Sequence, residues 1–278
     1  TIKYINQKKI DIIHYQFFRQ KSELLFFLLL RAIGKNVIIT AHNVLPHEYH
    51  WSNFYYQRLL FRTASGIIAH SEFIKNKIVE QLRILKQTIS VIPHGSYDQF
   101  NRSHSISQSQ ARKNLGLNDD DKVLLFFGYI KPYKGLDLLL EAFEIVADDI
   151  PDLKLIIAGN VESTRLKNFY EDKIKRMNLT GRILAYLKYI PMQDVPIYFM
   201  AADAVALPYR HIYHSGVTHL AFSFGRPVIA TDVGDFREVI ENGACGFISE
   251  KNCSESFANT LLLAFSNREK LKIMGMFY

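Results

Sequence analysis

The amino-acid sequence predicts an α/β fold in which helices cover parallel β-sheets. Short runs rich in β-branched residues alternate with longer helix-forming stretches, as expected for strand–helix–strand units. Hydrophobic residues make up 48% of the 278 residues and charged residues 22%, a composition that supports a globular core and argues against general disorder. A polar, Ser- and Asn/Asp-rich stretch over 96–120 interrupts the alternation, so we expect two domains, 1–100 and 101–278, joined there.

The strands and helices of both domains can be placed from this alternation. In the first domain, strands are expected at Asp11–Phe17, Val37–Ala41, Gly66–Ala69 and Thr88–Pro93, and helices in the Leu-rich stretch, over Phe54–Arg62, and from the N-cap Ser71 to Leu85. In the second domain, strands are expected at Val123–Phe127, Leu153–Ala158, Ile183–Tyr186, Ala204–Leu207 and Val228–Ala230, with helices from Leu136, over about 163–177 and 194–201, and from about Ser215.

Positive charge is concentrated in the first part of the chain. Residues 1–105 carry 14 Lys and Arg against 6 Asp and Glu, whereas the remainder carries 20 against 21. This imbalance favours an anionic partner for the first domain, either a membrane surface, a phospholipid-linked substrate or nucleic acid; a solvated basic surface is the alternative. The most apolar run, Leu24–Ile33, contains Arg31 and is too short to span a bilayer, which favours a buried helix over one that touches a membrane.

No metal site is expected. The sequence has neither an HExxH motif nor a paired aspartate beside a strand, and the Asp119–Asp121 run is interpreted as a turn and cap. The two cysteines, Cys245 and Cys253, have no metal-ligand pattern around them and predict reduced thiols in a cytoplasmic protein. His214 is as compatible with a structural role as with a chemical one.

Two segments have the features of anion-binding loops. In the first, a strand ends at Gly128, a loop carries Lys131 and Lys134, and a helix begins after Gly135. Glycine permits a close approach of backbone to ligand, a helix N-terminus favours an anion, and two lysines can neutralise a diphosphate. An ordinary surface loop with unremarkable lysines is the alternative for this segment taken alone.

The second segment runs from Leu207 to Glu238. Ser215 is expected to cap a helix while the amides of Gly216 and Val217 face outward. The loop over 231–235 follows another strand, where open parallel sheets bind ligands. We therefore expect both anion-binding helix starts to open on one crevice.

These two segments, with DIIHYQF, IITAHNVLPHE, GIIAHSEFIKNKI and VIPHG of the first domain, resemble the family 4 glycosyltransferases (group 1 glycosyl transferases) of the GT-B fold over nearly the whole chain. The resemblance implies two Rossmann-like parallel-sheet domains that face each other across a cleft. The family's first strand, its glycine-rich loop and its final helix have no counterpart in this sequence. We therefore expect the first domain to be incomplete and the chain to be truncated at both ends.

The resemblance also implies roles for individual residues. His42 matches the catalytic-site histidine that faces the donor sugar, and His47 and Glu48 are assigned to the acceptor side. The donor-binding residues are then Gly128, Lys131, Lys134, Ser215, Gly216, Val217 and Glu238. Lys131 is our own addition, because the family's arginine after the glycine is replaced by Tyr129.

The sequence departs from the family at a pair of glutamates eight positions apart. Ile212 and Leu220 stand at these positions, and the second glutamate usually holds the nucleotide ribose. Ribose recognition must therefore differ here or be weaker.

The function implied is transfer of a sugar from a nucleotide diphosphate sugar to a saccharide or lipid-linked acceptor, with retention of configuration and without metal or cofactor. Bacterial-type surface polysaccharide or glycolipid biosynthesis is expected, in the cytoplasm or peripherally on the inner face of an anionic membrane surface, with no nucleic acid partner. A non-catalytic nucleotide-sugar-binding or scaffolding protein and a GT-B sugar-nucleotide epimerase remain as alternatives.

Overall fold

The computed structural model describes residues 2–16, 23–44, 51–97, 106–240 and 244–275. The chain divides into two compact units, Thr1–His94 and Gly95–Tyr278, whereas the sequence suggested a boundary between residues 100 and 101. No helix in the described part of the chain combines the length and the apolar composition that a bilayer-spanning segment requires.

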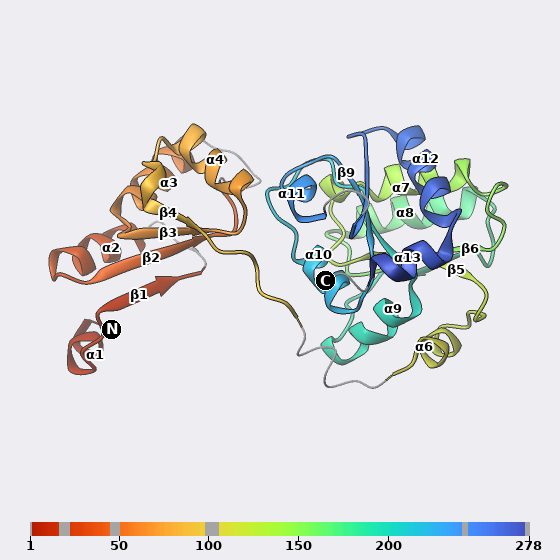
Figure 1. The fold of residues 1–278 in the computed structure, drawn as a ribbon, viewed down its shortest axis with the longest axis horizontal. Helices are drawn as coiled ribbons and strands as arrows, with labels where there is room; N and C mark the ends of the chain where they lie inside the picture. Colours follow the sequence, from red (N-terminus) through yellow and green to blue (C-terminus); the bar gives the residue numbers. More distant parts are fainter. Residues whose placement is uncertain (1, 17–22, 45–50, 98–105, 241–243, 276–278) are drawn as a thin grey trace. The chain divides into compact units, whose positions relative to one another are not determined.

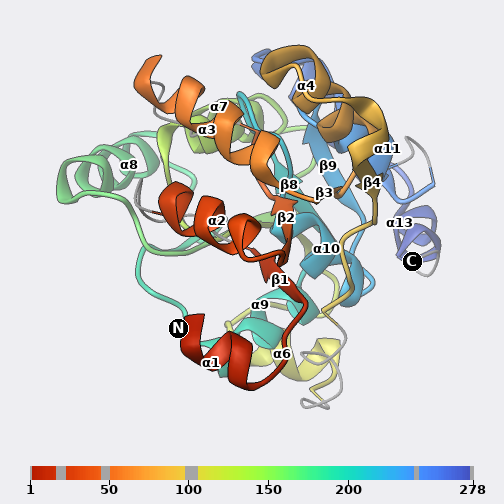
Figure 2. The ribbon, with the colours of Figure 1, turned by 90° about the vertical axis from the view of Figure 1, so that its left-hand side faces the viewer.

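The first unit contains a four-stranded parallel sheet in the order β1-β2-β3-β4. Its strands are β1 (Ile12–Tyr15), β2 (Asn36–Ala41), β3 (Gly66–Ala69) and β4 (Ile89–Val91), and its helices are α1 (Ile2–Gln7), α2 (Glu23–Ala32), α3 (Trp51–Thr63), α4 (Glu72–Leu82) and the 3-10 turn η1 (Lys86–Thr88). Helices α2, α3 and α4 lie on the same face of this sheet (Figure 1), and α2 packs beside α3 (Figure 2).

Local sequence explains where α4 begins and ends. The hydroxyl of Ser71 accepts a hydrogen bond from Ile74 N at 3.2 Å, which confirms the predicted N-cap. The helix ends at Leu82, before the predicted Leu85, because Arg83 adopts a left-handed conformation with φ 52°.

The second unit contains a six-stranded parallel sheet in the order β10-β9-β8-β5-β6-β7. Its strands are β5 (Lys122–Phe127), β6 (Leu153–Ala158), β7 (Ile183–Tyr186), β8 (Ala204–Leu207), β9 (Val228–Thr231) and β10 (Gly246–Ser249). The chain proceeds from β5 to β6 and β7 on one side and then returns to β8 on the other. The order of the strands therefore reverses between β5 and β8, which is where Rossmann-type sheets bind ligands beyond the carboxyl ends of the strands.

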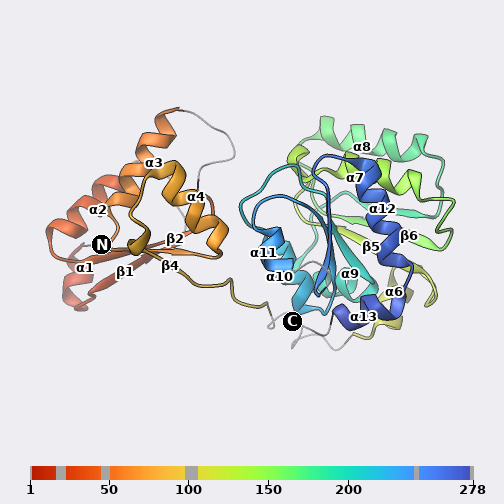
Figure 3. The same cartoon turned by 45° about the horizontal axis from the view of Figure 1, so that its top comes forward.

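Helices cover both faces of this sheet. They are α6 (Gln108–Asn114), α7 (Leu136–Ile145), α8 (Thr164–Arg176), α9 (Val195–Ala201), α10 (Gly216–Ser223), α11 (Phe236–Ile240), α12 (Ser254–Phe265) and α13 (Arg268–Met274), with 3-10 turns η2 (Pro132–Lys134) and η3 (Met192–Asp194). Alternate residues of β5 point to opposite faces: Leu124 packs in a core with residues of α7 and α12, and Leu125 in a core with residues of α9 and α10. Figure 3 shows α7, α8 and α12 on one side of the sheet and α9 and α10 on the other.

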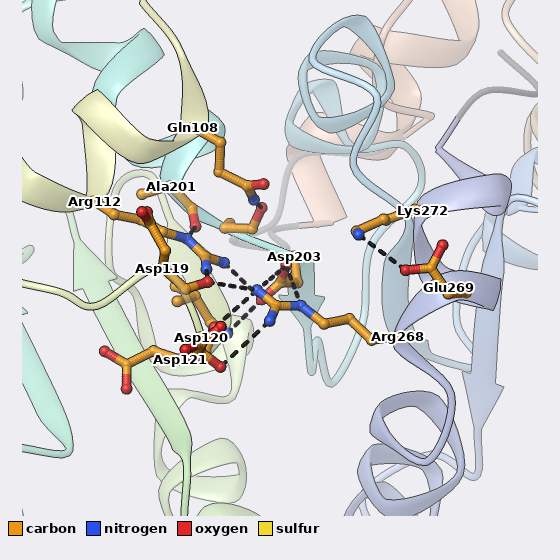
Figure 4. A network of polar contacts seen from close by, with 12 residues as sticks. Gln108, Arg112, Asp119, Asp120, Asp121, Ala201, Asp203, Arg268, Glu269 and Lys272 are labelled. Carbon is orange, nitrogen blue, oxygen red and sulfur yellow. Dashed lines mark hydrogen bonds and ion pairs between the residues drawn. The ribbon is translucent and has the colours of Figure 1, made fainter.

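The prediction that 96–120 is a linker is wrong at α6. Ser107 caps this helix by accepting a hydrogen bond from Gln110 N at 3.2 Å, and Arg112 within it is only 1% exposed. Its guanidinium lies 2.9 Å from Asp203 and donates to Ala201 O at 3.1 Å (Figure 4). The polar composition hid the helix because a charged residue can be buried when every donor finds a partner.

Asp203 joins several elements at the base of the sheet. Its carboxylate accepts a hydrogen bond from Val123 N at 2.8 Å and also pairs with Arg268 of α13 at 3.3 Å (Figure 4). Arg268 donates in turn to the carbonyls of the Asp119–Asp121 run. That run forms a turn closed by a hydrogen bond of 2.8 Å from Asn118 N to the carboxylate of Asp121, as predicted.

Candidate functional site

A pocket of about 370 Å³ opens at the carboxyl edge of the second sheet, beside the point where the strand order reverses. The loops after β5 and β8 and the start of α10 form its wall. It is lined by Tyr97, Tyr133, Lys134, Tyr209, Ile212, His214, Ser215, Gly216, Val217 and Leu220. Four predicted donor-binding residues, Lys134, Ser215, Gly216 and Val217, are thus brought together, although 81 residues separate Lys134 from Ser215 in the sequence.

Lys134 supplies positive charge to this pocket. Turn η2 places it at the end of the loop after β5, where it is 8% exposed and its Nζ lies 5.3 Å from the centre of the Tyr209 ring, within cation–π range. A β-carbon at Gly128 would stand 3.1 Å from this Nζ, and Gly128 has φ +106°, so only glycine fits comfortably beside the ammonium group. No carboxylate of the described residues forms an ion pair with Lys134.

The start of α10 supplies hydrogen-bond donors. Ser215 has the extended backbone of an N-cap residue and is 4% exposed, but its hydroxyl makes no capping hydrogen bond. The prediction that the Ser215 side chain caps the helix is therefore wrong, because an N-cap backbone does not dictate the side-chain rotamer. Thr218 N donates to Ser215 O at 3.2 Å, while the amides of Gly216 and Val217 have no acceptor within the helix.

His214 is held in the pocket wall by a residue that sequence reasoning missed. Its Nδ1 lies 2.6 Å from Oδ2 of Asp235, and the two side chains are 6% and 1% exposed. Asp235 follows Gly234, whose positive φ of 62° allows it to pack against Ile212 O, 2.5 Å from where a β-carbon would stand. The aspartate directly after a glycine at the end of β9 was the available signal.

Two predicted donor-binding residues lie away from the pocket lining. Lys131 forms an ion pair of 3.0 Å with Glu162, and this hydrogen bond raises the pKa of Lys131. Glu238 lies exposed on α11, and its backbone amide donates to Asp235 O at 3.0 Å. The structure therefore brings neither side chain into the set that surrounds the pocket.

Two tyrosines of the lining also went unnoticed in the sequence. The backbone amide of Tyr97 donates to the hydroxyl of Ser223 on α10 at 2.8 Å, which ties the start of the second unit to this helix. Tyr133 precedes Lys134, and burial raises the pKa of its phenol. Single tyrosines in loops have no pattern that marks them before the chain is folded.

The predicted residues of the first unit lie in a separate environment. His42 directly follows β2; its Nε2 lies 3.0 Å from Oε1 of Gln16, and its ring centre lies 5.0 Å from that of His70. His47 and Glu48, the predicted acceptor-side residues, lie outside the described residues.

Comparison with known proteins identifies the family. A family model described as "Glycosyl transferases group 1" matches residues 107–276, and one described as "Glycosyltransferase Family 4" matches residues 1–96. The chain belongs to the group 1 glycosyl transferases. The resemblance stated from the sequence motifs is thereby confirmed.

Relatives of this glycosyl transferase include two named mannosyltransferases. A GDP-mannose:glycolipid 4-beta-D-mannosyltransferase of Xanthomonas campestris is 29% identical over 212 residues, covering 76% of this chain and 54% of the relative. The lipopolysaccharide core biosynthesis mannosyltransferase LpsB of Rhizobium meliloti is 28% identical over 232 residues, covering 81% of this chain and 61% of LpsB. The chain thus spans less than two thirds of the length of these relatives.

Solved structures confirm the predicted fold class. HepE of Anabaena in complex with UDP superposes with a TM-score of 0.82 at 21% identity, covering 99% of this chain and 74% of HepE. A sucrose-phosphate synthase of Thermosynechococcus elongatus superposes with a TM-score of 0.80 at 17% identity, covering 99% of this chain and 69% of that protein. Both likenesses show the GT-B fold with its two Rossmann-like domains.

The glycosyl transferase departs from the family pattern inside the pocket. Ile212 and Leu220, which stand where most members carry glutamates, both line it. The replacement therefore changes the surface that a ligand meets, and does not lie in a remote part of the domain.

Proposed function

We propose that this protein transfers a sugar from a nucleotide diphosphate sugar to an acceptor, and that the pocket of the second unit binds the diphosphate of the donor. The observation that carries the proposal is the convergence of Lys134 with the first amides of α10 in one pocket. A largely buried ammonium group without a carboxylate partner among the described residues favours an anionic ligand. A diphosphate supplies that anion, and its size suits a cation and a helix N-terminus together.

Relatives support the classes of donor and acceptor. One relative is named for GDP-mannose and a glycolipid, and another for the lipopolysaccharide core; HepE has been solved with UDP and with UDP-glucose. We propose accordingly a nucleotide-sugar donor and a saccharide or lipid-linked acceptor, in surface polysaccharide or glycolipid biosynthesis. A cytoplasmic protein at the inner face of a membrane fits such an acceptor.

The chemistry requires stabilisation of the leaving group. The bond between the anomeric carbon and the phosphate oxygen breaks, a bond to the acceptor oxygen forms, and the acceptor proton passes to the leaving diphosphate. Lys134 and the amides of Gly216 and Val217 stabilise the charge that develops on that diphosphate, so the reaction is proposed to need no metal ion or cofactor. Retention of anomeric configuration is part of the same proposal, and His42 is assigned to positioning the sugar and not to acting as a base.

The proposal is tested first by binding. Calorimetry and thermal unfolding with UDP and GDP should show binding and a raised melting temperature, since a ligand of the native state stabilises it; uridine and guanosine should have far smaller effects. Binding should persist in excess chelator, and its loss there would contradict the metal-independent mechanism. Failure of every nucleoside diphosphate to bind would overturn the proposal.

A second measurement separates an enzyme from a binding protein. The full-length protein is incubated with a panel of sugar nucleotides, with and without saccharide and lipid-linked acceptors, and the released nucleoside diphosphate is measured. Turnover of a sugar nucleotide supports the transferase. Tight binding without turnover of any member of the panel would support the non-catalytic alternative.

A further inference from the structure

The pocket has a chemically distinct region one step away from its phosphate-binding end. Lys134 and the first amides of α10 mark the phosphate end, and Leu220 lies one helical turn further along α10, about 5.4 Å away. In a nucleoside diphosphate, the group next to the phosphates is the ribose. Leu220 is therefore placed where the ribose of a bound nucleotide would pass.

The lining around this position is apolar and aromatic. Ile212 and Leu220 contribute aliphatic side chains, and Tyr97, Tyr133 and Tyr209 contribute rings. No carboxylate belongs to the lining among the residues that the structure describes. Asp235 is 1% exposed and occupied by His214 at 2.6 Å, so it is screened from a ligand by the histidine.

Recognition of a ribose depends strongly on this difference. Proteins that select a ribonucleotide place a carboxylate against the ribose hydroxyls, which accepts hydrogen bonds from them. A site built in that way rejects a ligand that lacks the hydroxyl, because the buried acceptor is then left unpaired. An aliphatic wall leaves nothing unpaired when the hydroxyl is removed, so it discriminates weakly between the two ligands.

We infer that this pocket does not select the ribose 2′-hydroxyl, and that 2′-deoxyribonucleoside diphosphates bind about as tightly as ribonucleoside diphosphates. The inference rests on the proposed function, since it assumes that the pocket binds a nucleoside diphosphate. Its consequence is that donors built on deoxyribonucleotides are accessible to this protein. Affinity for the nucleotide then comes from the diphosphate and from the base, with the sugar ring between them contributing mainly contact area.

The test compares matched pairs of ligands by calorimetry on the full chain: UDP against 2′-deoxyuridine diphosphate, and GDP against 2′-deoxyguanosine diphosphate. For the pair that binds, the two dissociation constants should agree within about threefold. A preference of more than about tenfold for the ribonucleotide would overturn the inference and leave the proposed function standing. If none of the four ligands binds, the proposed function fails and the inference fails with it.

A substitution tests the assignment of Leu220. Leu220→Glu places a carboxylate on the same helix position and should shift the ratio of dissociation constants by about tenfold or more in favour of the ribonucleotide. Leu263→Glu is the matched control, because Leu263 lies 61% exposed on α12 and adds the same charge outside the pocket lining. An unchanged ratio in Leu220→Glu, with the fold intact by circular dichroism, would overturn the placement of Leu220 beside the ribose.

Discussion

Nδ1 of His214 lies 2.6 Å from Oδ2 of Asp235, and both side chains are almost completely buried. This hydrogen bond joins the loop before α10 to the start of α11 across a sequence separation of 21 residues. His214 lines the pocket and Asp235 stands behind it, so the aspartate acts on the pocket by holding the histidine in place.

Asp235→Ala should therefore affect both stability and binding. Loss of a buried hydrogen bond to a carboxylate should lower the free energy of unfolding by about 1.5–3 kcal/mol, and the affinity for a nucleoside diphosphate should fall because the pocket wall loosens. Asp235→Asn retains an acceptor oxygen and should recover much of both. Urea unfolding and calorimetry measure the two effects. Equal losses in the alanine and asparagine variants would contradict a role based on the position of His214.

Lys134→Ala should weaken binding of nucleoside diphosphates by about 1.5–3 kcal/mol, the scale of a lost charge-assisted hydrogen bond. Binding of the nucleoside should hardly change, because the lysine meets the phosphates only. Lys131→Ala is the matched control, since Lys131 lies three positions away and pairs with Glu162. Calorimetry that found the same loss for nucleoside and diphosphate, or the same loss in both variants, would remove Lys134 from the phosphate site.

Ser215→Ala and Gly216→Val should have opposite profiles. Ser215 makes no capping hydrogen bond, so its replacement should cost less than the about 1 kcal/mol typical of a lost cap. A β-carbon at Gly216 would stand 3.3 Å from the hydroxyl oxygen of Tyr97, and the larger valine should obstruct the pocket and abolish nucleotide binding while leaving stability nearly unchanged.

The control for the second variant is Gly66→Val, because a β-carbon at Gly66 meets nothing within 4 Å. Urea unfolding and calorimetry are applied to all three variants. Retention of full affinity in Gly216→Val would show that phosphates do not approach the amides of α10.

Asp203→Ala should strongly destabilise the second unit. Its removal leaves the buried Arg112 and the partly buried Arg268 without their shared carboxylate, and loss of one partner of a buried ion pair costs about 3–5 kcal/mol. Asp232→Ala, which removes a half-exposed aspartate paired with the exposed Arg237, should cost about 1 kcal/mol or less. Chemical unfolding of the two variants measures the difference, and similar losses would contradict a structural role for the Arg112–Asp203 pair.

Binding to vesicles should increase with anionic lipid and decrease with added salt, because residues 1–105 carry 14 basic against 6 acidic residues and the Debye length falls to about 8 Å at physiological ionic strength. Helix α2 also exposes Leu25 to 64%, and Leu28 and Leu29 each to 45%. Flotation of the full-length protein with neutral and anionic vesicles measures both effects. Salt-insensitive binding would assign the interaction to α2, and no binding to either vesicle would favour an acceptor that is not in a membrane.

Much of the fold could be predicted because its signals are local. The strands Gly66–Ala69, Leu153–Ala158, Ile183–Tyr186 and Ala204–Leu207 coincide with β3, β6, β7 and β8, since buried parallel strands are short β-branched runs bounded by turns. The same locality explains the error at α6. Its single buried side chain is an arginine, whose partners Asp203 and Ala201 lie about 90 residues away.

The sequence by itself determined the family, the α/β class and the loops that carry Lys134 and Gly216, because glycine and lysine spacing and the alternation of strands and helices are written in neighbouring residues. Only the tertiary structure decided which of these residues share a pocket. It turned Lys131 toward Glu162, left Glu238 on an exposed helix, and placed Asp235 against His214. Side-chain direction in a loop depends on contacts with distant segments, and a charged side chain takes whichever opposite charge the fold brings within reach.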